Sequence, residues 1–165
     1  MTESLVIGLD EAGRGPWAGP VTAAAVALGP VACQALLGQV RDSKVLTAKR
    51  REALVPIIKA QALAWGLGWS DVDEIDGLGI LKATFVAMKR AVHALFASLP
   101  SASSEGFLNE DSAAQMLNGQ KVRLIVDGSL HPARYLGENQ WPWPTETMVK
   151  ADARQIEVAA ASVLA

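Results

Sequence analysis

The sequence predicts an α/β fold built on a mixed β-sheet. Two observations lead to this class: the chain begins with two short apolar runs of strand length, and runs of strand and helix character alternate after them. Half of the 165 residues are hydrophobic and 19% are charged, which excludes wholesale disorder. We expect residues 1–165 to form a single domain, because a chain of this length suits one core.

The sequence predicts five strands, each a short run of apolar or extended character. They cover residues 5–9, 22–28, 63–69, 122–126 and 145–149. Glycine–proline pairs at 15–16 and 19–20 indicate a loop between the first two runs, and a third pair at 29–30 closes the second run. Residues 141–144, Trp-Pro-Trp-Pro, are expected to be extended. Their two tryptophans either stack on nucleic-acid bases or cover the core.

The clearest predicted helix spans residues 78–96, where apolar residues recur every three or four positions, at Leu81, Phe85, Met88, Val92 and Leu95. Another helix runs from residue 48 toward 59 with Thr47 as its N-cap, and Pro56 predicts a kink or a late start. Residues 70–74 are typical of a capped helical turn, and 153–165 of a final helix. The segment 99–120, rich in Ser, Ala and Asn, is predicted to be a surface insertion.

Three aspartates, Asp10, Asp127 and Asp152, each follow an apolar run or lie just past its end, and Glu11 follows Asp10 directly. In a sheet with several neighbouring strands, such residues can converge at one edge. Converging carboxylates could not all stay ionised without a cation, and their oxygen donors favour Mg²⁺ or Mn²⁺ over Zn²⁺. Two such ions about 3.5–4 Å apart can stabilise the attacking and leaving oxygens of a phosphodiester.

Each of these features also has a purely structural interpretation. Asp127 followed by Gly128 is typical of a turn, and an aspartate before a helix, such as Asp152, is commonly an N-cap. The glycines on either side of Arg14 can serve a turn alone. The order and spacing of the acids, taken together, favour the functional interpretation over these alternatives.

The net charge of −2 argues against a protein that holds nucleic acid by bulk positive charge. Residues 40–60 nevertheless carry a local excess of basic residues, which either face phosphates or form a solvated helix face. The single cysteine, Cys33, excludes an internal disulfide and a multi-cysteine zinc site, and we expect it to pack as a small apolar residue. The N-terminus lacks the basic start of a signal peptide, and no apolar stretch is long enough to span a bilayer, so we expect a cytoplasmic protein.

The segment 8–21, Gly-Leu-Asp-Glu-Ala-Gly-Arg-Gly-Pro-Trp-Ala-Gly-Pro-Val, resembles the N-terminal signature of ribonuclease HII, the type 2 ribonuclease H family. Further motifs of this family are matched in the same order by residues 42–46, 74–84, 125–128 and 150–165. The first match is long and specific, whereas the later ones are specific mainly through their order.

The resemblance implies an RNase H-like fold, which is a five-stranded mixed sheet flanked by helices. It also implies a metal-dependent endonuclease that uses Mg²⁺ or Mn²⁺, with two ions expected. Such an enzyme hydrolyses the RNA strand of RNA–DNA hybrids, cuts at single ribonucleotides in duplex DNA and leaves 5′-phosphate ends. From the sequence itself we expect no membrane association, and no obligate protein partner is evident in it.

Individual residues take their expected roles from the same resemblance. The family's four catalytic, metal-binding acids are matched by Asp10, Glu11, Asp127 and Asp152. The loop that recognises the RNA-to-DNA junction is matched by Gly13, Arg14 and Gly15, and glycines there let backbone amides approach a sugar-phosphate chain. Ser43 and Lys44 lie in the family's Asp-Ser-Lys segment and are expected to contact substrate.

The sequence departs from the family pattern at three positions and at its end. Gly79 and Ser129 stand where the family has asparagine, and Ala151 stands where it has glycine. Family members continue beyond the position of Ala165 with further helices, so we expect a C-terminally short domain. An alternative function is therefore a truncated, weakly active or inactive fragment of the same fold that binds metal or hybrid.

Overall fold

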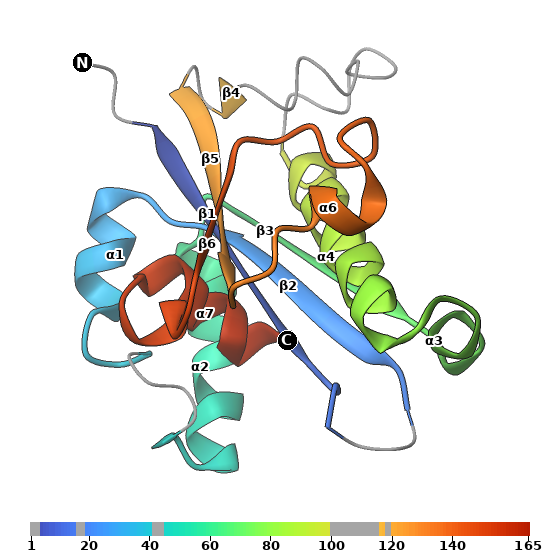
Figure 1. Cartoon of the computed structure of the whole chain (residues 1–165). Helices are drawn as coiled ribbons and strands as arrows, with labels where there is room; N and C mark the ends of the chain where they lie inside the picture. Colours follow the sequence, from blue (N-terminus) through green and yellow to red (C-terminus); the bar gives the residue numbers. More distant parts are fainter. Residues whose placement is uncertain (1–3, 16–18, 41–44, 100–115, 118–119) are drawn as a thin grey trace.

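The computed structural model of the chain describes residues 4–15, 19–40, 45–99, 116–117 and 120–165 (Figure 1). The strands within these ranges are β1 (Leu5–Ala12), β2 (Val21–Ala27), β3 (Ala64–Ser70), β4 (Met116–Leu117), β5 (Gln120–Asp127) and β6 (Thr145–Met148). All five strands that the sequence predicts are present. The additional β4 lies within the predicted insertion 99–120, most of which is outside the described residues.

The sheet is mixed and runs in the order β3-β2-β1-β5, with β6 and the short β4 both paired to β5. β2 pairs antiparallel with both β1 and β3, whereas β5 is parallel to β1 and β6 is parallel to β5. Five strands, without the two-residue β4, form the mixed sheet that the resemblance implies. The parallel β1–β5 pair places the ends of two strands from distant parts of the chain at the same edge.

Helices cover both faces of this sheet (Figure 1). On one face lie α4 (Ile80–Ala97) and the short α6 (Ala133–Leu136), and α3 (Val72–Leu78) leads into α4. On the other face lie α1 (Pro30–Leu36), α2 (Ala48–Gln61) and α7 (Ile156–Leu164), which is preceded by the 3₁₀ turn η3 (Ala151–Ala153). None of the helices in the described ranges is long and apolar enough to cross a membrane.

Alternation along β1 sorts its side chains between these two faces. Ile7 and Leu9 are fully buried in the core that includes α4. Gly8 lies against the other layer, where an added Cβ would clash with the α7 backbone at Glu157 and Val158. Because successive side chains of a strand point to opposite faces, Asp10 lies on the α7 side of the sheet.

Three helical features can be compared with the expectation. α7 begins at Ile156 rather than at residue 153, because residues 151–153 form the 3₁₀ turn. Pro56 lies inside α2, which runs without a break from Ala48, so the predicted late start is wrong. Proline is tolerated there because Pro56 is exposed, so solvent can reach the carbonyl that loses its partner. The N-cap prediction is confirmed, since Thr47 accepts a hydrogen bond from the Arg50 amide at 3.3 Å.

The sequence analysis did not predict α1 and α6, which are short and contribute few periodic apolar residues. The pair Gly29-Pro30, interpreted as the end of a strand, also starts α1 with proline at its first position.

The Trp-Pro-Trp-Pro segment covers the core. Trp141 and Trp143 are 2% and 5% exposed and lie perpendicular to each other with ring centroids 5.1 Å apart. Trp143 also lies edge-on to His93 of α4, at 5.4 Å. The alternative that these two tryptophans stack on bases is therefore wrong for this conformation, because neither ring faces solvent.

Candidate active site at the ends of β1 and β5

Two of the predicted acids lie side by side on parallel strands. Leu9 of β1 is in register with Val126 of β5, so the next residues, Asp10 and Asp127, occupy neighbouring positions on the same face. Asp10 is buried, with 4% exposure. Burial, and then the neighbouring charges of Glu11 and Asp127, raise the pKa of Asp10 from 3.8 to about 7.

Hydrogen bonds to the charged form of Asp10 oppose this rise only in part. The backbone amide of Glu11 donates to Asp10 Oδ1 at 2.8 Å, and Ser162 of α7 forms a hydrogen bond with the carboxylate. Both lower the pKa of Asp10, but burial outweighs them. No basic side chain among the described residues contributes to this balance. The site therefore holds a desolvated carboxyl group beside other carboxylates, which is an environment that a cation would stabilise.

A backbone contact connects the end of β5 to the turn that carries the third aspartate. The amide of Ala151 donates to Asp127 Oδ1 at 2.7 Å. Lys150, just before it, has a left-handed backbone with φ of 56°, unusual for a residue with a side chain, and this conformation leads the chain into η3. Asp152 follows within that turn and is 4% exposed.

Neither aspartate has the structural role that its local sequence allows. Asp127 is the last residue of β5, not part of a free turn. Asp152 is not the N-cap of α7, which is Gln155. The Asp127–Ala151 contact instead holds the turn that carries Asp152 against the end of β5.

Glu11 lies on a different side from Asp10, as the alternation of β1 requires. It forms an ion pair with Arg14, with Arg14 Nη1 3.2 Å from Glu11 Oε1. Glu11, Arg14 and Asp127 line one cleft of about 170 Å³, beside the start of α4. Asp152 lines a separate cleft of about 240 Å³ together with Glu157.

The four acids therefore lie around the same sheet edge without closing into one cluster. No group of three or more His, Cys, Asp or Glu side chains within the described ranges is arranged to hold a metal ion. The pair Asp10 and Asp127 is the part that the strand register brings together directly. The metal-binding roles of all four acids remain a prediction.

The predicted junction loop is described only at its start. Gly13 has φ of +92°, and a Cβ there would lie 2.6 Å from the Pro20 carbonyl oxygen, so both conformation and space require glycine. Gly15 has no atom within 4 Å of an added Cβ, so space does not restrict it. Ser43 and Lys44 lie outside the described residues.

Two residues near the site were missed by the sequence analysis. The local sequence around Ser162 carries no signal for its hydrogen bond, because its partner Asp10 is far away in the sequence. Glu157 is 8% exposed, and Cys33 Sγ lies 3.6 Å from its Oε1. Burial and this carboxylate raise the pKa of Cys33 to about 11, so the thiol stays protonated at neutral pH.

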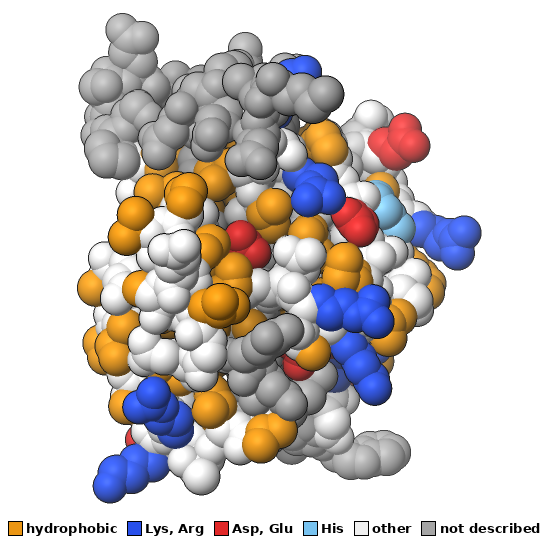
Figure 2. Space-filling view, turned by 90° about the vertical axis from the view of Figure 1, so that its left-hand side faces the viewer, with side chains coloured by type: hydrophobic (Ala, Val, Ile, Leu, Met, Phe, Trp, Pro, Cys, Tyr) orange, Lys and Arg blue, Asp and Glu red, His pale blue; other side chains and the backbone are white. Residues whose placement is uncertain are grey.

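The basic stretch 40–60 does not form one patch. Lys49, Arg50 and Arg51 are exposed in the first turns of α2, whereas Lys59 Nζ lies 4.3 Å above the centre of the Trp65 ring. Figure 2 shows Lys and Arg side chains in separate places on the molecular surface, with hydrophobic side chains between them. The described part of this stretch is therefore a solvated helix face at the start of α2, and the predicted contact with phosphates stays a prediction.

The family model and the curated relatives that match this chain carry the same family name. The family model described as ribonuclease HII matches residues 7–165. A protein named Ribonuclease HII from Hyphomonas neptunium is 42% identical over 161 residues, which cover 98% of this chain and 70% of that protein.

Solved structures show the same fold at lower identity. A point mutant of Bst-RNase HIII has a TM-score of 0.73 at 20% identity. Bst-RNase HIII in complex with Mn²⁺ has a TM-score of 0.69 at 18% identity. Each match covers 98% of this chain and 50% of the other, so the chain spans half the length of those proteins.

Proposed function

The chain belongs to the ribonuclease HII family, and from that premise we propose that it is an endonuclease that hydrolyses the RNA strand of RNA–DNA hybrids. The observation that carries the proposal is the adjacency of Asp10 and Asp127 at the ends of two parallel strands. We further propose that residues 1–165 act as one catalytic domain with 99–120 as a surface insertion.

The chemistry of the site fits a divalent cation. Its donors are carboxylate oxygens, which suit Mg²⁺ or Mn²⁺, and the raised pKa of Asp10 reflects a buried acid beside the carboxylates of Glu11 and Asp127. The structural neighbour Bst-RNase HIII was solved in complex with Mn²⁺. We infer that two ions are held by the predicted set, which is Asp10, Glu11, Asp127 and Asp152.

A bound divalent cation supplies Lewis-acid stabilisation of the attacking and leaving oxygens in phosphodiester hydrolysis. The chain itself contributes position and exclusion of water. Burial keeps Asp10 desolvated, and the Ala151 amide fixes one oxygen of Asp127. These groups are set by strand register and a backbone hydrogen bond rather than by mobile loops, which favours a preorganised site.

Substrate recognition is proposed for the loop that follows β1. The Gly13 conformation turns the chain sharply after the acids, so that Arg14 returns to pair with Glu11. Arg14 is close enough to the acids to steady a phosphate, and backbone amides of a glycine-rich loop can approach a ribose 2′-OH. This contact would direct cleavage to single ribonucleotides in duplex DNA and leave 5′-phosphate ends. Ser43 and Lys44 are proposed to contact the substrate as well.

A second candidate is a metal- or hybrid-binding unit with weak activity. One observation favours it, namely that no three acidic or other metal-binding side chains gather around one point in the described residues. The two candidates differ in whether the chain turns over substrate.

The test is incubation with a duplex that carries one ribonucleotide, in the presence of Mg²⁺ or Mn²⁺. We expect a single incision at the ribonucleotide, and Asp10→Asn or Asp127→Asn should lose at least about 10²-fold in rate, as is typical for removal of one electrostatic catalytic group. Binding without turnover by the wild-type chain would favour the second candidate. Full activity of either variant would contradict the assignment of these acids.

A further inference from the structure

Trp69 is an exposed tryptophan on the sheet face that carries Asp10. Its side chain is 61% exposed, whereas Trp141 and Trp143 are buried and Trp65, on the same strand and face, is half-buried beneath Lys59. An exposed indole offers a large and rigid apolar face to a ligand, so its position relative to the site is informative.

The strand register fixes that position. Asp10, Ala24 and Leu67 lie opposite one another across β1, β2 and β3. Two residues further along, Ala12, Thr22 and Trp69 form the next row on the same face. Trp69 therefore lies two strands away from Asp10 and two residues further along the strand direction. Standard sheet spacings place the two residues about 12 Å apart.

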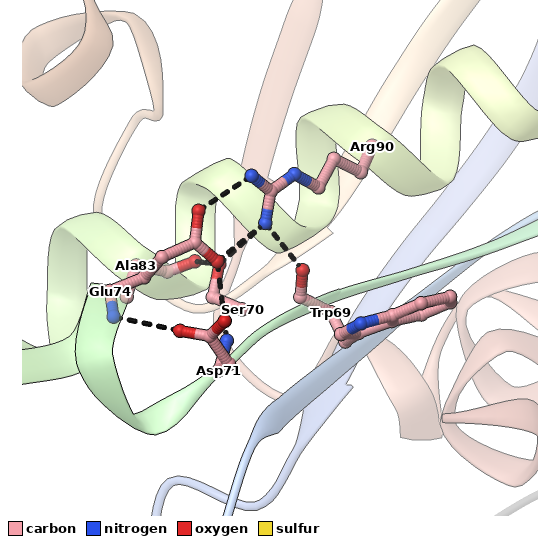
Figure 3. Close-up of polar contacts among 6 residues, drawn as sticks. All are labelled: Trp69, Ser70, Asp71, Glu74, Ala83 and Arg90. Carbon is pink, nitrogen blue, oxygen red and sulfur yellow. Dashed lines mark hydrogen bonds and ion pairs between the residues drawn. The ribbon is translucent and has the colours of Figure 1, made fainter.

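The backbone that presents this ring is held firmly from the opposite face (Figure 3). Arg90 of α4 donates to the Trp69 carbonyl oxygen at 2.7 Å and forms a two-point ion pair with Glu74, at 2.6 and 2.7 Å. Ser70 Oγ donates to the Ala83 carbonyl oxygen at 2.9 Å, and Asp71 and Glu74 cap each other's backbone amides. Figure 3 shows the Trp69 ring pointing away from this network.

We propose that Trp69 packs its indole against a nucleotide sugar of the duplex substrate, outside the cleaved step. The inference rests on the proposed function. The helices of this face cover the row that contains Asp10, but in the next row Ala12 and Trp69 are exposed and Thr22 is half-buried, so a duplex cleaved beside Asp10 would extend along this open end of the sheet. A separation of about 12 Å corresponds to three or four base-pair steps at about 3.4 Å per step. An aromatic ring suits a sugar or base face because the contact needs apolar area rather than charge.

The experiment is steady-state cleavage of a 12-base-pair hybrid in Mn²⁺ by wild type, Trp69→Ala and Trp69→Phe. Trp69→Ala should raise KM at least about 5-fold with kcat unchanged, since it removes the aromatic face that packs on the nucleotide. Trp69→Phe should largely restore KM. The exposed residue Val31, on α1, provides the matched control, and Val31→Ala should leave KM unchanged.

Two readouts separate a substrate contact from a structural defect. The slope of log KM against log salt should be the same for Trp69→Ala and wild type, because no phosphate contact is lost. The duplex has one arm on each side of the cleaved step. The rise of KM in Trp69→Ala should vanish when the arm that reaches Trp69 is shortened to two base pairs, and it should persist when the other arm is shortened. An unchanged KM in Trp69→Ala, a changed salt slope, or an effect independent of both arms would overturn the inference.

A cleavage-independent measurement keeps the two proposals distinguishable. The fluorescence difference between wild type and Trp69→Phe reports on this indole, and acrylamide should quench it less once the hybrid is added in EDTA. Protection without cleavage would support the contact while contradicting the proposed activity. Cleavage by wild type with no protection of Trp69 would contradict the contact alone.

Discussion

Asp10→Asn should stabilise the metal-free protein at high pH while it lowers the cleavage rate at least about 10²-fold. The physical reason is the raised pKa of Asp10: burial, with the nearby Glu11 and Asp127 charges, moves it from 3.8 to about 7 in the folded protein. Between these pH values the native state holds a proton that the unfolded chain has already released. Stability therefore falls as pH rises through this window, and the full cost is reached above pH 7.

The magnitude follows from the size of the shift. A difference of about three pKa units corresponds to about 4 kcal/mol of unfolding free energy at pH 8.5, of which less than half has already been lost at pH 5. An asparagine at this position has no proton to release. The stability advantage of Asp10→Asn over wild type should therefore grow by about 3 kcal/mol between pH 5 and pH 8.5.

The assay is urea unfolding in EDTA at a series of pH values, with the free energy of unfolding as the readout. Asp76→Asn is the matched control, because it removes one carboxylate from the exposed surface of α3 and changes net charge equally. Parallel pH profiles for wild type and Asp10→Asn would refute the reasoning. A wild-type protein that becomes more stable from pH 5 to 8.5 relative to Asp10→Asn would reverse its sign.

Three further predictions concern the site and the strand that carries it. Mn²⁺ or Mg²⁺ should raise the melting temperature of wild type, by an amount equivalent to about 2.7 kcal/mol at one hundred times the dissociation constant, and much less in Asp10→Asn; equal shifts by calorimetry would argue against the site. Arg14→Ala should weaken hybrid binding with little effect on metal binding, and Gly13→Val should be worse because of the positive φ and the Pro20 carbonyl; binding titrations that show native ribose preference in both variants would remove the loop from recognition. Gly8→Ala should lower the free energy of unfolding by more than about 2 kcal/mol, because its Cβ meets the α7 backbone; denaturation that matches wild type would contradict this close approach.

The sequence alone was sufficient for most of the fold. The apolar runs at 5–9 and 122–126 are strands because burial on both faces favours continuous apolar sequence, and the three-to-four-residue spacing at Leu81–Leu95 places one helix face on the sheet. Thr47 and Asp71 could be recognised as helix starts because capping is local chemistry. The family resemblance added the roles expected of the four acids and of the loop at Gly13, Arg14 and Gly15.

Local sequence could not decide how the acids meet. Asp10 and Asp127 are neighbours only because β5 pairs parallel with β1, with Leu9 beside Val126, and pairing register is a property of two distant segments. The same holds for the Asp127–Ala151 hydrogen bond and for Ser162 beside Asp10.

Tertiary structure also decided the environment of each side chain. Asp10 and Glu11 are adjacent in sequence, yet alternation along β1 buries Asp10 and leaves Glu11 beside Arg14. Trp69 and Trp143 are chemically identical, but Trp69 ends an edge strand and Trp143 is packed between α4 and the core. Residue type and spacing determine which elements form, because those preferences are local. Burial, charge proximity and pKa depend on which elements pack together, and only the assembled fold fixes them.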